Sequence, residues 1–150
     1  MIKKVYVDSS IIGGVSDVEF SEHSKKLMLE FKSGLYIPII SSLTAEEINN
    51  APPGVRETFR EMRRYAHFIK LTEDAVALSK QYMKDGKFSR RMLADTLHIA
   101  LASVNKIDIL VSWNFRDIVN LNKIVIYNAV NIKFGYPLIE IRNPREILHD

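Results

Sequence analysis

The sequence predicts an α/β fold, a three-layer α/β/α sandwich around a mostly parallel central sheet, formed by one domain over residues 1–150. Short apolar runs alternate along the chain with longer amphipathic segments, which is typical of parallel sheets covered by helices. The expected order of elements is β-α-β-α-α-β-α-α-β-β. A chain of 150 residues has the usual length of one domain and is long enough to bury a substantial core.

The amino-terminal part of the chain provides the first three elements. The β-branched and aromatic run at residues 5–7 favours a strand. Residues 20–31 carry apolar side chains on one side and charged ones on the other, which predicts an amphipathic helix. A second apolar run at residues 35–40 predicts the next strand.

The middle of the chain is expected to be mainly helical. A short helix is predicted over 45–50, and a strongly basic helix follows over 54–66. Residues 68–71 predict a third, short strand. Thr72 then caps a helix that ends near Gly86, because these residue types are typical of the two ends of a helix.

The last third of the chain completes the predicted sheet. Apolar residues at three- and four-residue spacing indicate a helix over 90–105. A fourth strand is predicted over 107–111, a helical turn over 118–121 and a fifth strand over 124–127. The tail, residues 136–148, is expected to pack on the body of the domain.

Composition and charge narrow the classes of function. The chain has no cysteine, which excludes a disulfide framework, thiol catalysis and zinc–thiolate sites, and fits the reducing cytoplasm. The net charge of +3 and pI of about 9.1 permit a polyanionic partner. No signal peptide is expected, because Lys3, Lys4 and Asp8 interrupt the apolar start. No membrane span is expected either, because the longest apolar stretch, residues 35–40, is far below the roughly 20 residues of a span. The glycine-rich phosphate motifs and the serine elbow of hydrolases are absent.

Acidic and polar residues follow the predicted strands where they end. Asp8 follows the first strand, Glu46 and Glu47 lie in the helix after the second, and Asn114 and Asp117 follow the fourth. Because the carboxyl ends of parallel strands meet at one edge of a sheet, we expect these side chains to converge. Alternatively, Asn114 is a turn residue and Asp117 a solvent-exposed carboxylate.

Asp95 is the most informative acid, because the helix around it is apolar on nearly all sides and is therefore expected to be buried. An ionised carboxylate there needs a paired charge or a metal ion. The helix N-terminus contributes only about 0.3–1 kcal/mol toward holding that charge. The alternative is a salt bridge with Arg91, four residues earlier.

Two further residues have structural alternatives. Asp8 could cap a turn with Ser9 and Ser10. Thr44 and Glu47 have the spacing of a capping box, so Glu47 could serve only to begin a helix. All of these structural alternatives would have to be true at the same time for the acids at this edge of the sheet to have no function.

Several carboxylates at one place repel each other, and a divalent cation removes that repulsion. Oxygen ligands without thiols or paired imidazoles favour Mg²⁺ or Mn²⁺ over Zn²⁺. Such ions bind phosphoryl oxygens and activate water, which suits phosphodiester cleavage. Four histidines lack the spacing of a metal site and are interpreted as structural: His23, His67, His98 and His149.

Four stretches of the chain together resemble the PIN domain, in particular the VapC-like ribonuclease toxins of toxin–antitoxin pairs. They occur in the family's order, at family-like spacing, and are spread over most of the chain. The stretch around Asp95 is the most specific of them. The four stretches are residues 5–12, 40–48, 93–102 and 109–118.

The resemblance implies roles for individual residues. The implied catalytic residues are Asp8, Glu47, Asp95 and Asn114. The implied metal ligands are Asp8, Glu47, Asp95 and Asp117. The expected substrate contacts are Ser10, Ser112, Arg90 and Arg91. Glu46 is the alternative to Glu47, and Asn114 replaces an acid of the family with a neutral and weaker ligand.

The resemblance also implies an activity and partners. The implied activity is that of a Mg²⁺- or Mn²⁺-dependent endoribonuclease that acts on a structured RNA such as tRNA or rRNA. The implied partners are a cognate antitoxin and a second copy of the chain in a homodimer. One competing hypothesis is a degenerate PIN domain that binds RNA or a protein without cleavage. Another is a phosphotransferase with Asp8 as nucleophile, which is disfavoured because Ser10 stands where a second acid is usual.

Overall fold

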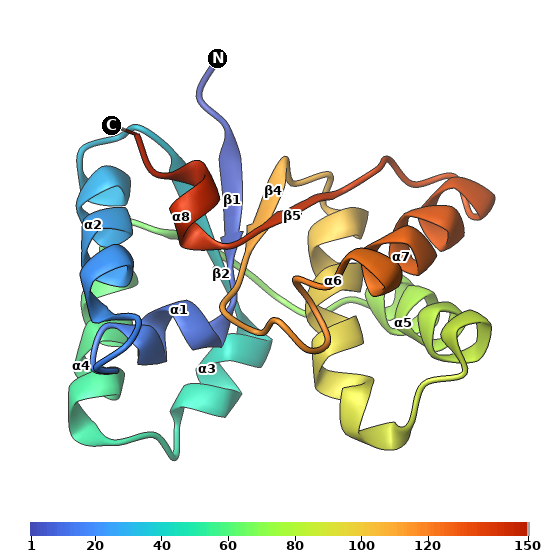
Figure 1. Cartoon of the computed structure of the whole chain (residues 1–150), viewed down its shortest axis with the longest axis horizontal. Helices are drawn as coiled ribbons and strands as arrows, with labels where there is room; N and C mark the ends of the chain where they lie inside the picture. The colour runs from blue at the N-terminus through green and yellow to red at the C-terminus, as the bar shows by residue number, and fades with distance from the viewer. Residues whose placement is uncertain (150) are drawn as a thin grey trace.

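The computed structural model describes residues 1–149 and contains a five-stranded sheet in which every neighbouring pair of strands is parallel. The strand order is β3-β2-β1-β4-β5, so β1 lies at the centre (Figure 1). The predicted parallel sheet is therefore confirmed. The strands are β1 (Lys4–Val7), β2 (Ile37–Ser41), β3 (His67–Ile69), β4 (Ile109–Val111) and β5 (Glu140–Arg142).

Side chains of the central strand alternate between two apolar cores. Val5 and Val7 pack into one core and Tyr6 into the other, because successive residues of a strand face opposite sides. Helices cover both faces of the sheet (Figure 1), so the predicted three-layer sandwich is confirmed. The first core contains residues of α1 (Ser9–Gly14), α2 (Ser21–Lys32), α3 (Ser42–Ile48), α4 (Pro53–Met62) and α8 (Pro144–Ile147). The second contains residues of α5 (Glu73–Gly86), α6 (Leu93–Val104) and α7 (Leu121–Lys133).

Most predicted helices lie close to their expected bounds. The helix expected over 20–31 is α2, and the helix capped by Thr72 is α5, in which the Thr72 hydroxyl accepts a hydrogen bond from the Ala75 amide. The helix expected over 90–105 begins as a short 3₁₀ turn, Arg90–Met92, before α6. Helix α1 was not predicted, because its six residues show no amphipathic repeat.

The predicted fifth strand at 124–127 is wrong, because these residues lie inside α7 and the fifth strand is Glu140–Arg142. The β-branched run favours a strand locally, but Asn120 caps a helix here by accepting a hydrogen bond from the Lys123 amide at 3.2 Å. Tyr127 is buried on the inner side of that helix. Tertiary packing therefore overrides the local propensity.

The tail packs on the body, as predicted. β5 extends the sheet beside β4, and the Tyr36 hydroxyl donates to the Ile147 carbonyl at 2.6 Å. Across residues 1–149, none of the helices combines the length and the apolar character that crossing a lipid bilayer requires.

Candidate active site

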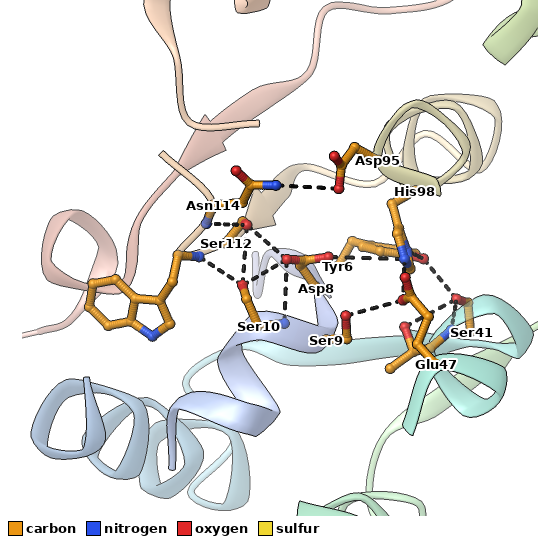
Figure 2. Close-up of polar contacts among 12 residues, drawn as sticks. Tyr6, Asp8, Ser9, Ser10, Ser41, Glu47, Asp95, His98, Ser112 and Asn114 are labelled. Atoms are coloured by element: carbon orange, nitrogen blue, oxygen red, sulfur yellow. Dashed lines mark hydrogen bonds and ion pairs between the residues drawn. The ribbon is translucent and has the colours of Figure 1, made fainter. Parts of the chain in front are cut away.

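The carboxyl ends of β1, β2 and β4 bring polar side chains together at one edge of the sheet (Figure 2). Asp8 directly follows β1, Ser112 directly follows β4, and Ser41 is the last residue of β2. Asp95 reaches the same place from the first turn of α6. Open α/β sheets bind their ligands at this edge.

Asp8 is held by one of its two carboxylate oxygens. Oδ2 accepts hydrogen bonds from the Ser10 hydroxyl at 2.7 Å, the Ser10 amide at 3.4 Å and the Ser112 hydroxyl at 2.8 Å. Asp8 therefore caps the helix α1, where the structural alternative expected a capped turn. Oδ1 accepts no hydrogen bond from any described residue and lies 4.0 Å from Nε2 of His98. One oxygen of a carboxylate that is only 4 % exposed thus remains available to a ligand.

Ser10 and Ser112 orient Asp8 and join α1 to the loop after β4. Their hydroxyls lie 3.3 Å apart. The Ser10 hydroxyl also accepts from the Trp113 amide at 2.9 Å, and the Ser112 hydroxyl accepts from the Asn114 amide at 2.9 Å. Ser112 is completely buried, so the expectation that it contacts substrate gives way to a role in holding the carboxylate.

Asp95 carries an uncompensated charge. It is half-buried, and within residues 1–149 its carboxylate accepts one hydrogen bond, from the Asn114 side-chain amide at 3.3 Å. Burial, followed by the negative charge of Asp8, raises the pKa of Asp95 to about 6. The expected alternative, a salt bridge with Arg91, does not form, because Arg91 pairs with Asp117 instead.

Asn114 is a turn residue that also contacts the site. Its side-chain oxygen accepts from the backbone amides of Arg116 at 3.2 Å and Asp117 at 3.0 Å, and its side-chain nitrogen donates to Asp95. Because the oxygen is occupied by the backbone, Asn114 presents a hydrogen-bond donor to the site. It therefore orients Asp95.

Asp117 is paired with two cations, and its negative charge also contributes to the raised pKa of Asp95. Arg91 donates to both of its oxygens, at 2.5 and 3.2 Å, and Lys123 donates to one of them at 2.6 Å. Burial raises the pKa of Asp117, but these hydrogen bonds outweigh burial and hold the pKa below its usual value. Asp117 is only 4 % exposed, so the solvent-exposed alternative is wrong. Arg90 is exposed and forms no ion pair within residues 1–149.

Glu47 faces the site from α3 and contacts His98, whereas Glu46 contacts none of the site residues. The capping-box alternative is wrong, because Ser41 caps α3 by accepting from the Thr44 amide at 3.3 Å. Oε1 of Glu47 instead accepts from His98 Nε2 at 2.6 Å and from the Ser9 hydroxyl at 3.1 Å. Burial raises the pKa of Glu47, but the hydrogen bond from His98 outweighs burial and lowers it.

His98 is the residue that the sequence interpretation missed. It is only 1 % exposed, and its ring nitrogens contact the Tyr6 hydroxyl on one side and Glu47 on the other, each at 2.6 Å. Burial lowers the pKa of the imidazole, but Glu47 and Asp8 together outweigh burial and raise it. Its position three residues after Asp95, on the same side of an apolar helix, was the signal available in the sequence.

The predicted metal ligands are only partly assembled. Asp8 and Asp95 point toward the same space (Figure 2), whereas Glu47 is bound to His98 and Asp117 to its two cations. Within residues 1–149 no three His, Cys, Asp or Glu side chains lie close enough together to hold a metal ion. The donor chemistry of Asp8 and Asp95 nevertheless suits a hard divalent cation, because both side chains are carboxylates. The negative charge of Asp8 raises the pKa of Asp95, and a bound cation would relieve this repulsion.

Three solved structures share this fold at low sequence identity. FitAcB from Neisseria gonorrhoeae has a TM-score of 0.60 at 11% identity, over 95% of this chain and 99% of that one. VapBC2 from Rickettsia felis, bound to a promoter DNA fragment, has a TM-score of 0.59 at 12% identity, over 93% of this chain and 98% of that one. VapC20 from Mycobacterium tuberculosis, a toxin that cleaves the sarcin–ricin loop, has a TM-score of 0.56 at 12% identity, over 75% of this chain and 91% of that one.

No protein-family model matches the chain, and no curated protein sequence is similar enough to match it. At 11–12% identity the likeness to the solved structures concerns the fold. The predicted resemblance to VapC-like PIN domains is confirmed at that level.

Proposed function

Because the chain has the fold of VapC-type toxins, we propose that it is a Mg²⁺- or Mn²⁺-dependent endoribonuclease and the toxin of a type II toxin–antitoxin pair. The observation that carries this proposal is the pair Asp8 and Asp95. The fold brings two carboxylates 87 positions apart in sequence to one sheet edge, where the charge of one raises the pKa of the other. Proteins place uncompensated acids together mainly at functional sites.

Asp8 and Asp95 would hold the cation, with Glu47 as the third acidic ligand. The cation would supply phosphoryl binding and an activated water. Ser10 and Ser112 keep one oxygen of Asp8 occupied, so that the other faces the site. Asn114 directs the Asp95 carboxylate through its side-chain amide.

The proposed substrate is a structured RNA such as tRNA or rRNA. One of the structures with this fold, VapC20, cleaves the sarcin–ricin loop. Exposed cations shortly before Asp95 in the sequence, Lys87 and Arg90, and the exposed arginines Arg56, Arg63 and Arg64 offer groups that can follow a phosphate backbone. VapBC2 supports a cognate antitoxin as partner, and a homodimer is proposed from the family resemblance.

The test is cleavage of a panel of tRNA and rRNA fragments by the purified protein with Mn²⁺. Asp8→Asn and Asp95→Asn should each reduce cleavage by about 100-fold or more while circular dichroism stays unchanged. Glu46→Gln is the matched control and should cleave like the wild type. Full activity in either Asp variant would overturn the proposal.

A second candidate is a degenerate PIN domain that binds RNA or a protein without cleaving. It is favoured by Asn114, whose oxygen is occupied by backbone amides. Calorimetric titration with Mn²⁺ separates the two functions. Absence of binding at millimolar Mn²⁺, together with retained RNA binding, would support the second candidate.

A further inference from the structure

A buried chain of hydrogen bonds runs from β2 through β1 and α6 to Glu47 (Figure 2). The Ser41 hydroxyl lies 2.7 Å from the Tyr6 hydroxyl, which lies 2.6 Å from Nδ1 of His98. Nε2 of His98 lies 2.6 Å from Oε1 of Glu47. Tyr6, Ser41 and His98 are each at most 1 % exposed, so the chain is isolated from water up to its last member.

The direction of the last hydrogen bond follows from the chemistry of its partners. An ionised carboxylate can only accept, so Nε2 of His98 carries the proton and donates to Glu47. This holds whether the ring is neutral or charged, because both forms can carry a proton on Nε2. The Tyr6 hydroxyl occupies the other ring nitrogen and prevents the ring from turning.

Glu47 depends on this bond for its position. It lies near the end of a seven-residue helix, its side chain is 37 % exposed, and a glutamate in that setting has several rotamers open to solvent. His98 Nε2 also lies 4.0 Å from Oδ1 of Asp8, the oxygen that accepts no hydrogen bond from the described residues. The imidazole N–H therefore keeps Glu47 next to Asp8 in spite of their like charges.

We propose that His98, fixed by Tyr6, is a positioning residue that holds Glu47 beside Asp8 so that the third carboxylate of the site is in place for the cation. This inference rests on the proposed function. Hydrogen-bond partners of ligating carboxylates typically contribute about 10–100-fold to metal affinity or activity. His98 itself acts through Glu47.

The experiment compares three substitutions of His98 in the full chain. His98→Leu removes both ring nitrogens, His98→Asn keeps a polar atom near Nδ1 only, and His98→Gln keeps a donor near Nε2 only. Mn²⁺ affinity is measured by calorimetry, and RNA cleavage is separated into kcat and KM. His98→Leu and His98→Asn should weaken Mn²⁺ binding by about tenfold or more and lower kcat with little change in KM. His98→Gln should keep most of the Mn²⁺ affinity and most of kcat.

Controls separate positioning from a general loss of structure. His67→Gln, at an exposed histidine of β3, and Tyr65→Phe, whose hydroxyl donates to the Met28 sulfur at 3.9 Å and to no other described residue, should behave like the wild type. Tyr6→Phe keeps the ring packed and removes only the hydroxyl, so it should weaken Mn²⁺ binding less than His98→Leu does. It also keeps the proposal testable if His98→Leu does not fold.

Two results would overturn the inference and leave the proposed function standing. Wild-type Mn²⁺ affinity in His98→Leu or Tyr6→Phe would show that Glu47 does not need the buried chain. Equal behaviour of the Asn and Gln variants would show that the Nε2 position is not the one that matters. Failure of the wild type itself to bind Mn²⁺ would instead overturn the proposed function, and the inference with it.

Discussion

Asp117 lies in the loop that follows β4, Asp95 contacts that loop through Asn114, and the two carboxylates have opposite environments. Asp117 is bound by Arg91 and Lys123, and its pKa is lowered. Asp95 has one neutral donor and acidic neighbours, and its pKa is raised to about 6. Asp117 therefore stabilises the fold. Asp95 destabilises it, but its carboxylate, unpaired within residues 1–149, can bind a ligand.

The difference shows that an acid at a strand end is not a ligand by position alone. Asp117 satisfies the same positional rule as Asp8, yet its two oxygens are already occupied by cations. Which acids remain available is decided by the neighbouring side chains. Substitutions at the two sites should therefore have opposite effects on activity and stability.

The largest expected contrast is in activity. Asp95→Asn should reduce RNA cleavage by about 100-fold or more, whereas Asp117→Asn should stay within a few-fold of the wild type when both are assayed well below their melting temperatures. Rates measured at saturating Mn²⁺ check this. Equal losses in the two variants would place Asp117 back among the metal ligands.

Stability should change in the opposite sense. Asp117→Asn leaves Arg91 and Lys123 without their partner, and we expect a loss of about 2 kcal/mol at pH 7, below the range for fully buried pairs because Arg91 is 44% exposed. The pKa of Asp117 is lower in the folded chain than its usual value of 3.8, so its contribution is present above pH 3.8 and lost as the pH falls further. Urea unfolding at pH 7 and pH 3 measures both effects.

Mn²⁺ should stabilise the wild-type chain by about 1.4 kcal/mol at ten times its dissociation constant, and chelation should reverse the effect. Asp8→Asn should remove this stabilisation, and Asp117→Asn should retain it. Thermal melts with and without Mn²⁺ provide the measurement. A shift that persists in Asp8→Asn would mean that the ion binds elsewhere.

The smallest expected effect is a gain in stability. The pKa of Asp95 rises from 3.8 to about 6 on folding, so the native state loses stability between about pH 4 and pH 6 and stays lower above that window. Asp95→Asn removes the buried charge, and at pH 7 it should stabilise the chain by about 1 kcal/mol after allowance for solvent screening. The gain should be absent at pH 3.5, and a variant less stable than the wild type at pH 7 would contradict the raised pKa.

Part of this arrangement could be predicted from the sequence because it depends on local rules. An apolar strand followed by Asp8 and an apolar helix around Asp95 each indicate a buried acid near a sheet edge, and parallel pairing brings the two together. The partners of Asp117 could not be predicted, since Arg91 and Lys123 lie 26 residues before and 6 after it, and nothing in the sequence links them.

Two other features were beyond local reasoning. The run 124–127 has strand propensity, and only its packing against the second core makes it helical. His98 has apolar sequence neighbours, which favoured a structural role, while its actual partners, Tyr6 and Glu47, come from other elements. Hydrogen bonds between residues far apart in the sequence are therefore the part that the sequence alone does not reveal.

Tyr6 belongs to two systems at once. Its ring lies in the second core, and its hydroxyl joins Ser41 to His98 in the contacts that lead to Glu47. Selection for a stable protein and selection for an active one therefore act on the same side chain, but on different atoms. Phenylalanine at this position would fill the core but could not hydrogen-bond His98. The residue found here in a related protein should therefore indicate whether that protein has kept the activity or only the fold.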